Sequence, residues 1–264
     1  MKEYFISEID IEKLYHLSDI KIKLDSNKRQ HLLLTGKNGS GKTSLLLEIE
    51  KFLRAINDEK LSQVFDQYPT WINEAKKKVL SASSDSEKYA ADKDLKQCLG
   101  FLKKYSDGVQ INLNQYEGLE MMYHNGKFIT AYFPSERKAQ FMRPNGVENI
   151  TLENTYGIDE SAGDILLKYM VHLKTQQAYA RNEGDQTTAN QIQKWFDRFD
   201  SALQILLDEE SIHIEYDYKK YNFKIRQNGR EPFSFNELSD GYSSVIYIVS
   251  DLILRMDKNW LLED

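Results

Sequence analysis

Several features are scarce in this 264-residue sequence, and each absence excludes a class of protein. Its single cysteine, Cys98, has no partner for an internal disulfide, so we expect a reducing, cytoplasmic compartment. No apolar run is long enough to span a bilayer, and the residues after Met1 do not form the apolar region of a signal peptide. The net charge of -6 argues against a globally basic nucleic-acid binder. The densest basic run, Lys76-Lys77-Lys78, is typical of a solvated helix face, because acidic residues lie nearby and no aromatics are interleaved with it.

What the sequence does contain is a phosphate-binding motif. Every fixed position of the P-loop pattern G-x-x-x-x-G-K-S/T is filled by Gly36-Lys37-Asn38-Gly39-Ser40-Gly41-Lys42-Thr43. An apolar, strand-like segment, residues 31–35, precedes it, and an apolar helical pattern follows from Ser44. The glycines let backbone N–H groups turn toward phosphate oxygens, and the following helix adds its positive N-terminal end. We therefore expect Lys42 to contact the β and γ phosphates and the Thr43 hydroxyl to bind Mg²⁺.

The residues around this motif predict an antiparallel N-terminal lobe. Segments 4–14 and 20–24 alternate with the two-residue period of half-buried strands. Tyr15 and His16, which precede the second strand, are candidates for stacking on a nucleotide base, but they are equally ordinary as exposed loop aromatics. Residues 52–105 carry apolar side chains at helical intervals with a serine-rich break at 81–86, which predicts a helical insertion.

Strand patterns return after the insertion. Segments 109–113, 119–123 and 128–133 are expected to be strands, and the Asn125-Gly126 pair predicts a tight hairpin turn between the last two. Arg137 follows directly, at the end of a strand that could lie beside the P-loop strand. It is a candidate contact for the γ-phosphate, although an ordinary surface turn is the slightly favoured interpretation.

Two long helices are predicted over 159–181 and 187–209. The second ends in Ile205-Leu206-Leu207-Asp208-Glu209, which imitates a Walker B strand, whose Asp holds Mg²⁺ and whose Glu polarises the attacking water. Apolar residues at intervals of three and four place this run inside an amphipathic helix instead.

A second motif lies near the C-terminus. Strand-like segments 212–216 and 221–226 precede Leu238-Ser239-Asp240-Gly241, and an apolar helix over 245–256 follows it. Alone, Ser239-Asp240 would be a helix cap. Together with the P-loop about 200 residues upstream, the hydroxyl of Ser239 and the close approach allowed by Gly241 favour an anion site at a helix N-terminus.

These two motifs, with 132–137 as a looser match, resemble the ABC-type ATPase heads of the structural-maintenance-of-chromosomes and RecF group, and especially the bacterial AAA-family ATPases of Septu and retron-associated antiphage systems. The resemblance implies an α/β P-loop NTPase fold of ABC-head type over 1–264, with an antiparallel N-terminal lobe and a helical insertion. It divides the chain into a β lobe with the P-loop (1–55), the helical insertion (56–106), a β-hairpin region (107–156), a helical lobe (157–210) and strands with the signature helix (211–264). In such heads the Walker B strand follows the signature helix, so the sequence is expected to be either a fragment of a longer ATPase or a shortened one. Gln140 is the nearest match to the family's coupling glutamine.

The resemblance also implies a function. The cofactors are ATP and Mg²⁺, two heads close around ATP with Ser239 and Gly241 acting in trans, and the dimer controls a partner such as a nuclease in antiphage defence. No catalytic residue is assigned. The alternative is a clamp or scaffold subunit that binds nucleotide without hydrolysing it. A GTPase is disfavoured because Asn27-Lys28 precedes the P-loop and lacks the Asp that reads guanine, and a kinase because no arginine-rich lid is evident.

Overall fold

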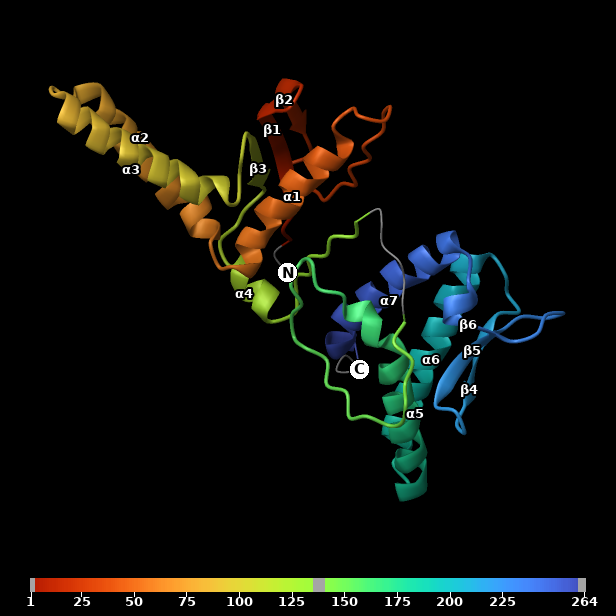
Figure 1. The fold of residues 1–264 in the computed structure, drawn as a ribbon. Helices are drawn as coiled ribbons and strands as arrows, with labels where there is room; N and C mark the ends of the chain where they lie inside the picture. Colours follow the sequence, from red (N-terminus) through yellow and green to blue (C-terminus); the bar gives the residue numbers. More distant parts are fainter. Residues whose placement is uncertain (1–2, 135–140, 261–264) are drawn as a thin grey trace. The chain divides into compact units, whose positions relative to one another are not determined.

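The computed structural model describes residues 3–134 and 141–260 and divides the chain into two compact units, Met1–Thr130 and Ala131–Asp264 (Figure 1). Each unit has its own hydrophobic core. The P-loop belongs to the first unit and the Ser239–Gly241 motif to the second.

A three-stranded antiparallel sheet forms the base of the first unit. Its strands are β1 (Ile6–Leu14), β2 (Leu17–Lys23) and β3 (Val109–Leu113), in the order β2-β1-β3. Ile9 and Ile11 on β1 are buried, whereas Asp10 between them pairs with Lys21 across β2. The sequence predicted strands over 4–14, 20–24 and 109–113; β2 begins earlier than predicted, at Leu17, and its burial does not alternate, since Ile20 is exposed.

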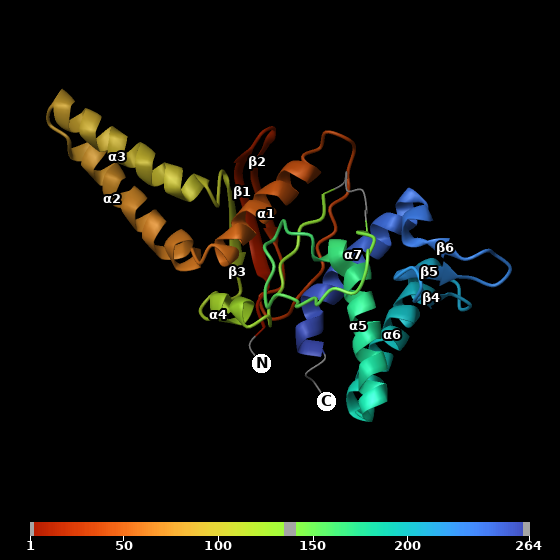
Figure 2. The same ribbon diagram turned by 60° about the horizontal axis from the view of Figure 1, so that its bottom comes forward.

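Helices complete the first unit. The helix α1 (Lys42–Asn57) buries Leu45, Phe52 and Ile56 at helical intervals against the sheet. A π-helical turn (Gln63–Gln67) leads into α2 (Tyr68–Ser81), which lies side by side with α3 (Asp85–Lys103) in Figure 2. The predicted serine-rich break separates them, because Ser84 caps α3 by accepting a hydrogen bond from the Glu87 N–H at 3.3 Å.

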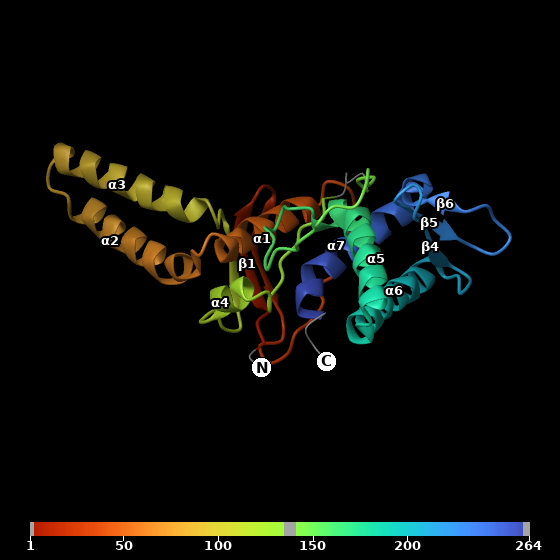
Figure 3. The same cartoon turned by 90° about the horizontal axis from the view of Figure 1, so that it is seen from below.

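The second unit is a helical layer with a small antiparallel sheet. A 3₁₀ turn (Ala162–Ile165) leads into α5 (Leu166–Glu183), and α6 (Gln186–Leu207) returns alongside it (Figure 3). The strands β4 (His213–Asp217), β5 (Asn222–Arg226) and β6 (Phe233–Ser234) pair in that order. A second 3₁₀ turn (Phe235–Glu237) then precedes α7 (Asp240–Trp260), which begins earlier than the expected 245.

Three of the predicted strands are wrong. Residues 31–35 and 128–133 form no strand, and Leu33 is 84% exposed. Among the described residues neither segment pairs with a strand, so the parallel pair that the P-loop interpretation expected is not formed; the Tyr132 N–H donates instead to the Ile158 carbonyl at 2.8 Å. Segment 119–123 is the helix α4 (Leu119–His124), and Asn125-Gly126 ends that helix instead of turning a hairpin. The described part of the expected β-hairpin region, 107–134 and 141–156, therefore holds one strand and one helix.

Candidate nucleotide-binding site

The P-loop adopts the backbone conformation for which its glycines are needed. Gly36, Gly39 and Gly41 have φ values of 152°, 79° and 91°, in the region that other residues rarely adopt. A β-carbon at Gly36 would lie 2.8 Å from the Ser40 hydroxyl oxygen. The loop is closed by a hydrogen bond from the Ser40 N–H to the Lys37 carbonyl at 3.2 Å.

The side chain of Lys42 reaches back across this loop. Its Nζ donates to the carbonyl oxygens of Gly36 at 2.8 Å and Lys37 at 2.9 Å. The ammonium group is thus held at the mouth of the loop, on the exposed side, and its contacts are weak backbone carbonyls that an anion can replace. The Lys42 side chain and the loop backbone, the two groups that the sequence predicted to contribute, therefore lie in contact.

The helix that begins at Lys42 leaves its first N–H groups available. Its N-cap is Gly41, which offers no side-chain cap, and its first turn contains no acidic residue. The uncapped N–H groups and the helix dipole both favour an anion at this end. Thr43 is exposed beside them, and its hydroxyl makes no hydrogen bond within the described chain.

The turn between β1 and β2 packs against the backbone of the P-loop at Gly41. A β-carbon at Gly41 would lie 2.8 Å from Leu17 Cδ1 and 3.6 Å from His16 Cε1, so the backbone of the loop rests on these two side chains. Tyr15, at the tip of the same turn, is exposed and has a positive φ of 53°. The sequence pattern pointed to Tyr15 and His16, and the structure places His16 next to the start of α1. No sequence pattern pointed to Leu17, which precedes the predicted strand 20–24.

These residues fit a nucleoside triphosphate with Mg²⁺. The glycine conformations, the open helix N-terminus and the single ammonium group provide the anion cradle. The described residues contain no group of three or more His, Cys, Asp or Glu side chains that could hold a metal by themselves. Mg²⁺ would therefore depend on Thr43, phosphate oxygens and water, which is how this ion is usually bound beside phosphates.

The Ser239–Gly241 motif lies at the start of α7 in the second unit. Ser239 occupies the cap position, because its carbonyl accepts the Ser243 N–H at 2.8 Å. Its side chain is exposed and makes no hydrogen bond to the described residues, unlike Ser84, whose hydroxyl caps α3. A β-carbon at Gly241 would meet nothing within 4 Å, so packing does not require a glycine there. Packing therefore does not require the glycine at 241, whereas serine is a usual residue at a helix N-cap.

A buried ion pair fixes α7 in its unit. Asp251 and Arg255, almost fully buried, pair at 2.5 Å, and Asp251 Oδ1 accepts the Gly163 N–H at 3.0 Å. The Arg255 guanidinium also donates to the carbonyl oxygens of Gly157, at 3.1 Å, and Glu160. Because the remaining lone pairs and N–H groups are satisfied, this pair can persist in a core. The sequence analysis missed it, although an Asp and an Arg four residues apart on an apolar helix are a recognisable signal.

Two further sequence candidates have different outcomes. Arg137 and Gln140 lie outside the described residues. The Walker B imitation, in contrast, is helical as predicted: Ile205 to Leu207 end α6, and Asp208 adopts φ 50° at its C-cap. Glu209 accepts hydrogen bonds from the Ser211 N–H and hydroxyl at 3.1 and 2.7 Å, which lower the pKa of its carboxyl. Asp208 and Glu209 thus shape the turn between α6 and β4.

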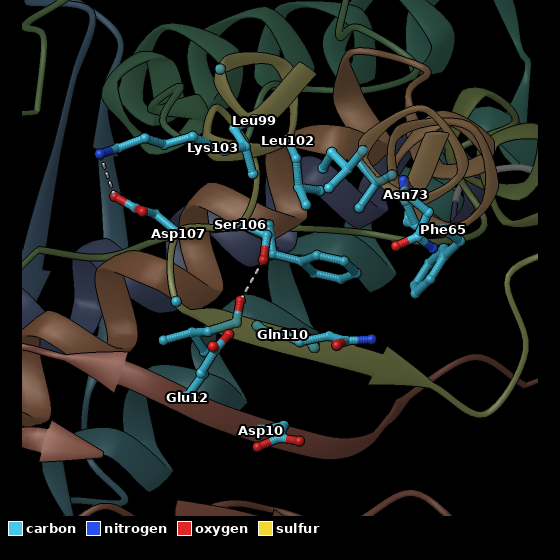
Figure 4. Close-up of a pocket in the computed structure, with 18 of the residues that line it drawn as sticks. Asp10, Glu12, Phe65, Asn73, Leu99, Leu102, Lys103, Ser106, Asp107 and Gln110 are labelled. Carbon is cyan, nitrogen blue, oxygen red and sulfur yellow. Dashed lines mark hydrogen bonds and ion pairs between the residues drawn. The ribbon is translucent and has the colours of Figure 1, made fainter. Parts of the chain in front are cut away.

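A cavity of the first unit is separate from the P-loop. It encloses about 1010 Å³ between the base of the α2–α3 pair and β3 (Figure 4). Its polar groups largely pair with one another: Lys103 with Asp107 at 3.3 Å, and the Ser106 hydroxyl with the Val109 carbonyl at 2.7 Å. No P-loop residue lines it, so it offers no part of the nucleotide site.

Within the described part of the chain, no helix has the length and apolar character needed to cross a membrane. Comparison of the chain with protein-family models, with curated proteins and with solved structures finds no match.

Proposed function

We propose that this chain is the ATP-binding subunit of an ATPase of the ABC and structural-maintenance-of-chromosomes type, and that it binds Mg-ATP at Gly36–Thr43. The observation that carries the proposal is the pose of Lys42, whose ammonium group lies across a loop with three glycines in left-handed conformations. Such a loop costs conformational stability, and at Gly39 a β-carbon would meet nothing within 4 Å, so packing does not require that glycine. Anion binding accounts for it.

Each residue of the loop has a role in this proposal. The N–H groups of Lys37 to Gly41 surround the phosphates, with Asn38 and Ser40 in the variable positions of the cradle. Lys42 exchanges its two carbonyl contacts for the β and γ phosphates, and Thr43 supplies an oxygen ligand to Mg²⁺. Adenine and a role in antiphage defence rest on the family resemblance alone, and a cytoplasmic location rests on the single cysteine, Cys98.

The exposed Ser239 and Gly241 support a second step. We assign them to the γ-phosphate of a second subunit's ATP, so that nucleotide promotes self-association. A dimer of this kind would control a partner, such as a nuclease. Arg137 remains a candidate γ-phosphate contact from sequence.

The second candidate function is a clamp or scaffold subunit that binds ATP without turning it over. One observation favours it: Asp208 and Glu209 form the turn after α6, where Glu209 accepts hydrogen bonds from Ser211, and they do not stand at the end of a buried strand as a Walker B pair does. Both functions share the nucleotide site, so the first experiment concerns binding.

That experiment compares Lys42→Ala with the wild type by isothermal titration calorimetry with Mg-ATP and Mg-GTP. We expect Lys42→Ala to weaken ATP binding by about 1.5 to 3 kcal/mol, because a charge-assisted contact to phosphate is lost. Lys77→Ala, an exposed lysine of α2 outside the site, is the matched control and should leave affinity unchanged. Equal ATP affinity in Lys42→Ala and wild type would remove the loop from the nucleotide site.

A further inference from the structure

The turn between β4 and β5 presents two tyrosines and two lysines. Its residues are Tyr218-Lys219-Lys220-Tyr221, closed by the pairing of Asp217 with Asn222 (Figure 1). The Asp217 carboxylate accepts the Lys219 N–H at 3.1 Å, and its carbonyl accepts the Lys220 N–H at 3.1 Å. The backbone of the turn is therefore fixed, while Tyr218 is 67% and Tyr221 38% exposed.

Tyr221 is at a position where the fold favours another residue. Its φ is 49°, in the left-handed region, where glycine is unstrained and a bulky residue is an outlier. Tyrosine here destabilises the turn and leaves a large ring partly in water. Strain of this kind, when the surrounding structure imposes it, is concentrated at functional sites. The aromatic ring, which glycine lacks, must therefore account for a tyrosine at this strained position.

The lysines of the turn lie beside its aromatic rings: Lys219 Nζ is 5.8 Å from the centroid of the Tyr218 ring. Lys219 and Lys220 form no ion pair with any described residue, whereas Arg226, further along β5, pairs with Glu215 at 2.6 Å. Residues 213–231 contain five lysines and arginines against three acidic residues, in a chain of net charge -6. The hairpin is thus locally positive on an acidic protein.

From this combination we infer that the β4–β5 turn binds single-stranded nucleic acid, with Tyr218 and Tyr221 stacking on bases and Lys219 and Lys220 contacting phosphates. Aromatic rings beside cationic groups are the general recognition elements for unpaired bases, because every base presents a flat face and a neighbouring phosphate. Duplex DNA hides those faces, so the turn discriminates against it. Two ammonium groups set the size of the site at about two phosphates, which predicts a salt slope of about -1.4 in log K against log salt.

The test is fluorescence anisotropy of the full chain, without nucleotide, with a labelled 15-nucleotide oligothymidylate at low salt. Tyr221→Gly should weaken binding about tenfold, the equivalent of one lost stacking contact, and should raise the melting temperature because it removes the backbone strain. If Tyr221 only stabilised the fold, Tyr221→Gly would lower both the affinity for the oligonucleotide and the melting temperature. Tyr218→Ala, where the backbone is unstrained, should weaken binding without altering the melting temperature.

Lysine variants separate local from general electrostatics. Lys219→Gln with Lys220→Gln should remove most of the salt dependence, whereas the matched pair Lys76→Gln with Lys77→Gln on α2 should leave affinity and salt slope unchanged. The inference is overturned if the oligonucleotide does not bind, if both lysine pairs weaken binding equally, if Tyr221→Gly retains wild-type affinity, or if a duplex of the same length competes as well as the single strand.

Discussion

The buried carboxyl of Asp257 gives the sharpest stability prediction. Asp257 lies on α7 with no exposed surface, and its Oδ2 accepts the Tyr169 hydroxyl of α5 at 2.5 Å. Burial raises its pKa to about 6, while the Tyr169 hydroxyl and the nearby Trp195 N–H act in the opposite direction. In the unfolded chain the same group has its ordinary pKa of 3.8.

The sign of the pH dependence follows from these two values. Between about pH 4 and pH 6 the folded protein retains a proton that the unfolded chain releases, so stability contributed by Asp257 falls as the pH rises through this window. Above about pH 6 the loss is complete. The difference corresponds to about 3 kcal/mol, since each unit of pKa is worth about 1.4 kcal/mol.

Asp257→Asn should abolish the loss of stability that the Asp257 carboxyl causes as the pH rises. The amide is neutral at every pH and its oxygen can still accept the Tyr169 hydroxyl, so the variant should exceed the wild type by about 2 to 3 kcal/mol at pH 7 and match it near pH 4. Urea unfolding followed by circular dichroism, repeated from pH 4 to 7.5, measures the difference, in which the contributions of distant carboxyls cancel. Glu183→Gln, at an exposed residue of α5, is the control for removing one carboxyl group from the surface. A constant difference between Asp257→Asn and wild type across this range would refute the reasoning.

Three further predictions concern the two motifs. Gly41→Ala should abolish ATP binding in calorimetry and lower the melting temperature, because the new β-carbon would lie 2.8 Å from Leu17 Cδ1 and the backbone φ is 91°. Gly241→Ala should keep or slightly raise the melting temperature, because its β-carbon would meet nothing within 4 Å. Ser239→Arg should block ATP-dependent self-association in light scattering with a non-hydrolysable analogue, and unchanged association would reduce the motif to a helix start. Phosphate release by the wild type should not exceed that of Lys42→Ala. Glu209→Gln should leave phosphate release unchanged, because the Glu209 carboxylate is engaged with Ser211. Turnover that Glu209→Gln abolishes would contradict the helical interpretation of this segment.

Periodicity predicted the elements in which burial follows chain geometry. Ile9 and Ile11 alternate with polar residues and form a strand, and Trp195, Phe199 and Leu203 recur at intervals of four and form one face of α6. The same periodicity decided the Walker B question, since it placed Ile205 on a helix, where the structure leaves it 80% exposed. A Walker B strand would have buried that residue.

The failures occurred where tertiary contacts chose between local alternatives. Leu119 and Tyr123 are buried one turn apart while Met121 is exposed, a helical pattern that five residues are too few to distinguish from alternation. Long-range bonds settle it: Glu120 accepts the Leu61 N–H at 2.9 Å, and the Tyr123 hydroxyl donates to Asn57 at 2.8 Å. Segment 31–35 failed for a different reason, since an apolar run specifies a strand only when a neighbouring strand is present to pair with it.

The candidate site was predictable to the extent that glycine reports backbone conformation. Gly36, Gly39 and Gly41 have positive φ, and a pattern of fixed glycines carries that information directly. The support of the loop by Leu17 did not follow from sequence, because it depends on how a turn from another segment packs.

The second motif shows how a helix can be rigid at one end and open at the other. The polar anchors of α7 begin at Tyr247, whose hydroxyl donates to Asp164 at 2.8 Å, and continue with the Asp251–Arg255 pair and the Asp257 carboxyl. None of these groups contacts Ser239 or Gly241. Charged and buried groups therefore hold the axis of the helix, while its first turn leaves the Ser239 side chain exposed. Serine at this N-cap is what helix formation alone favours, so the glycine at 241, which packing does not require, is the one position of the motif that folding does not explain.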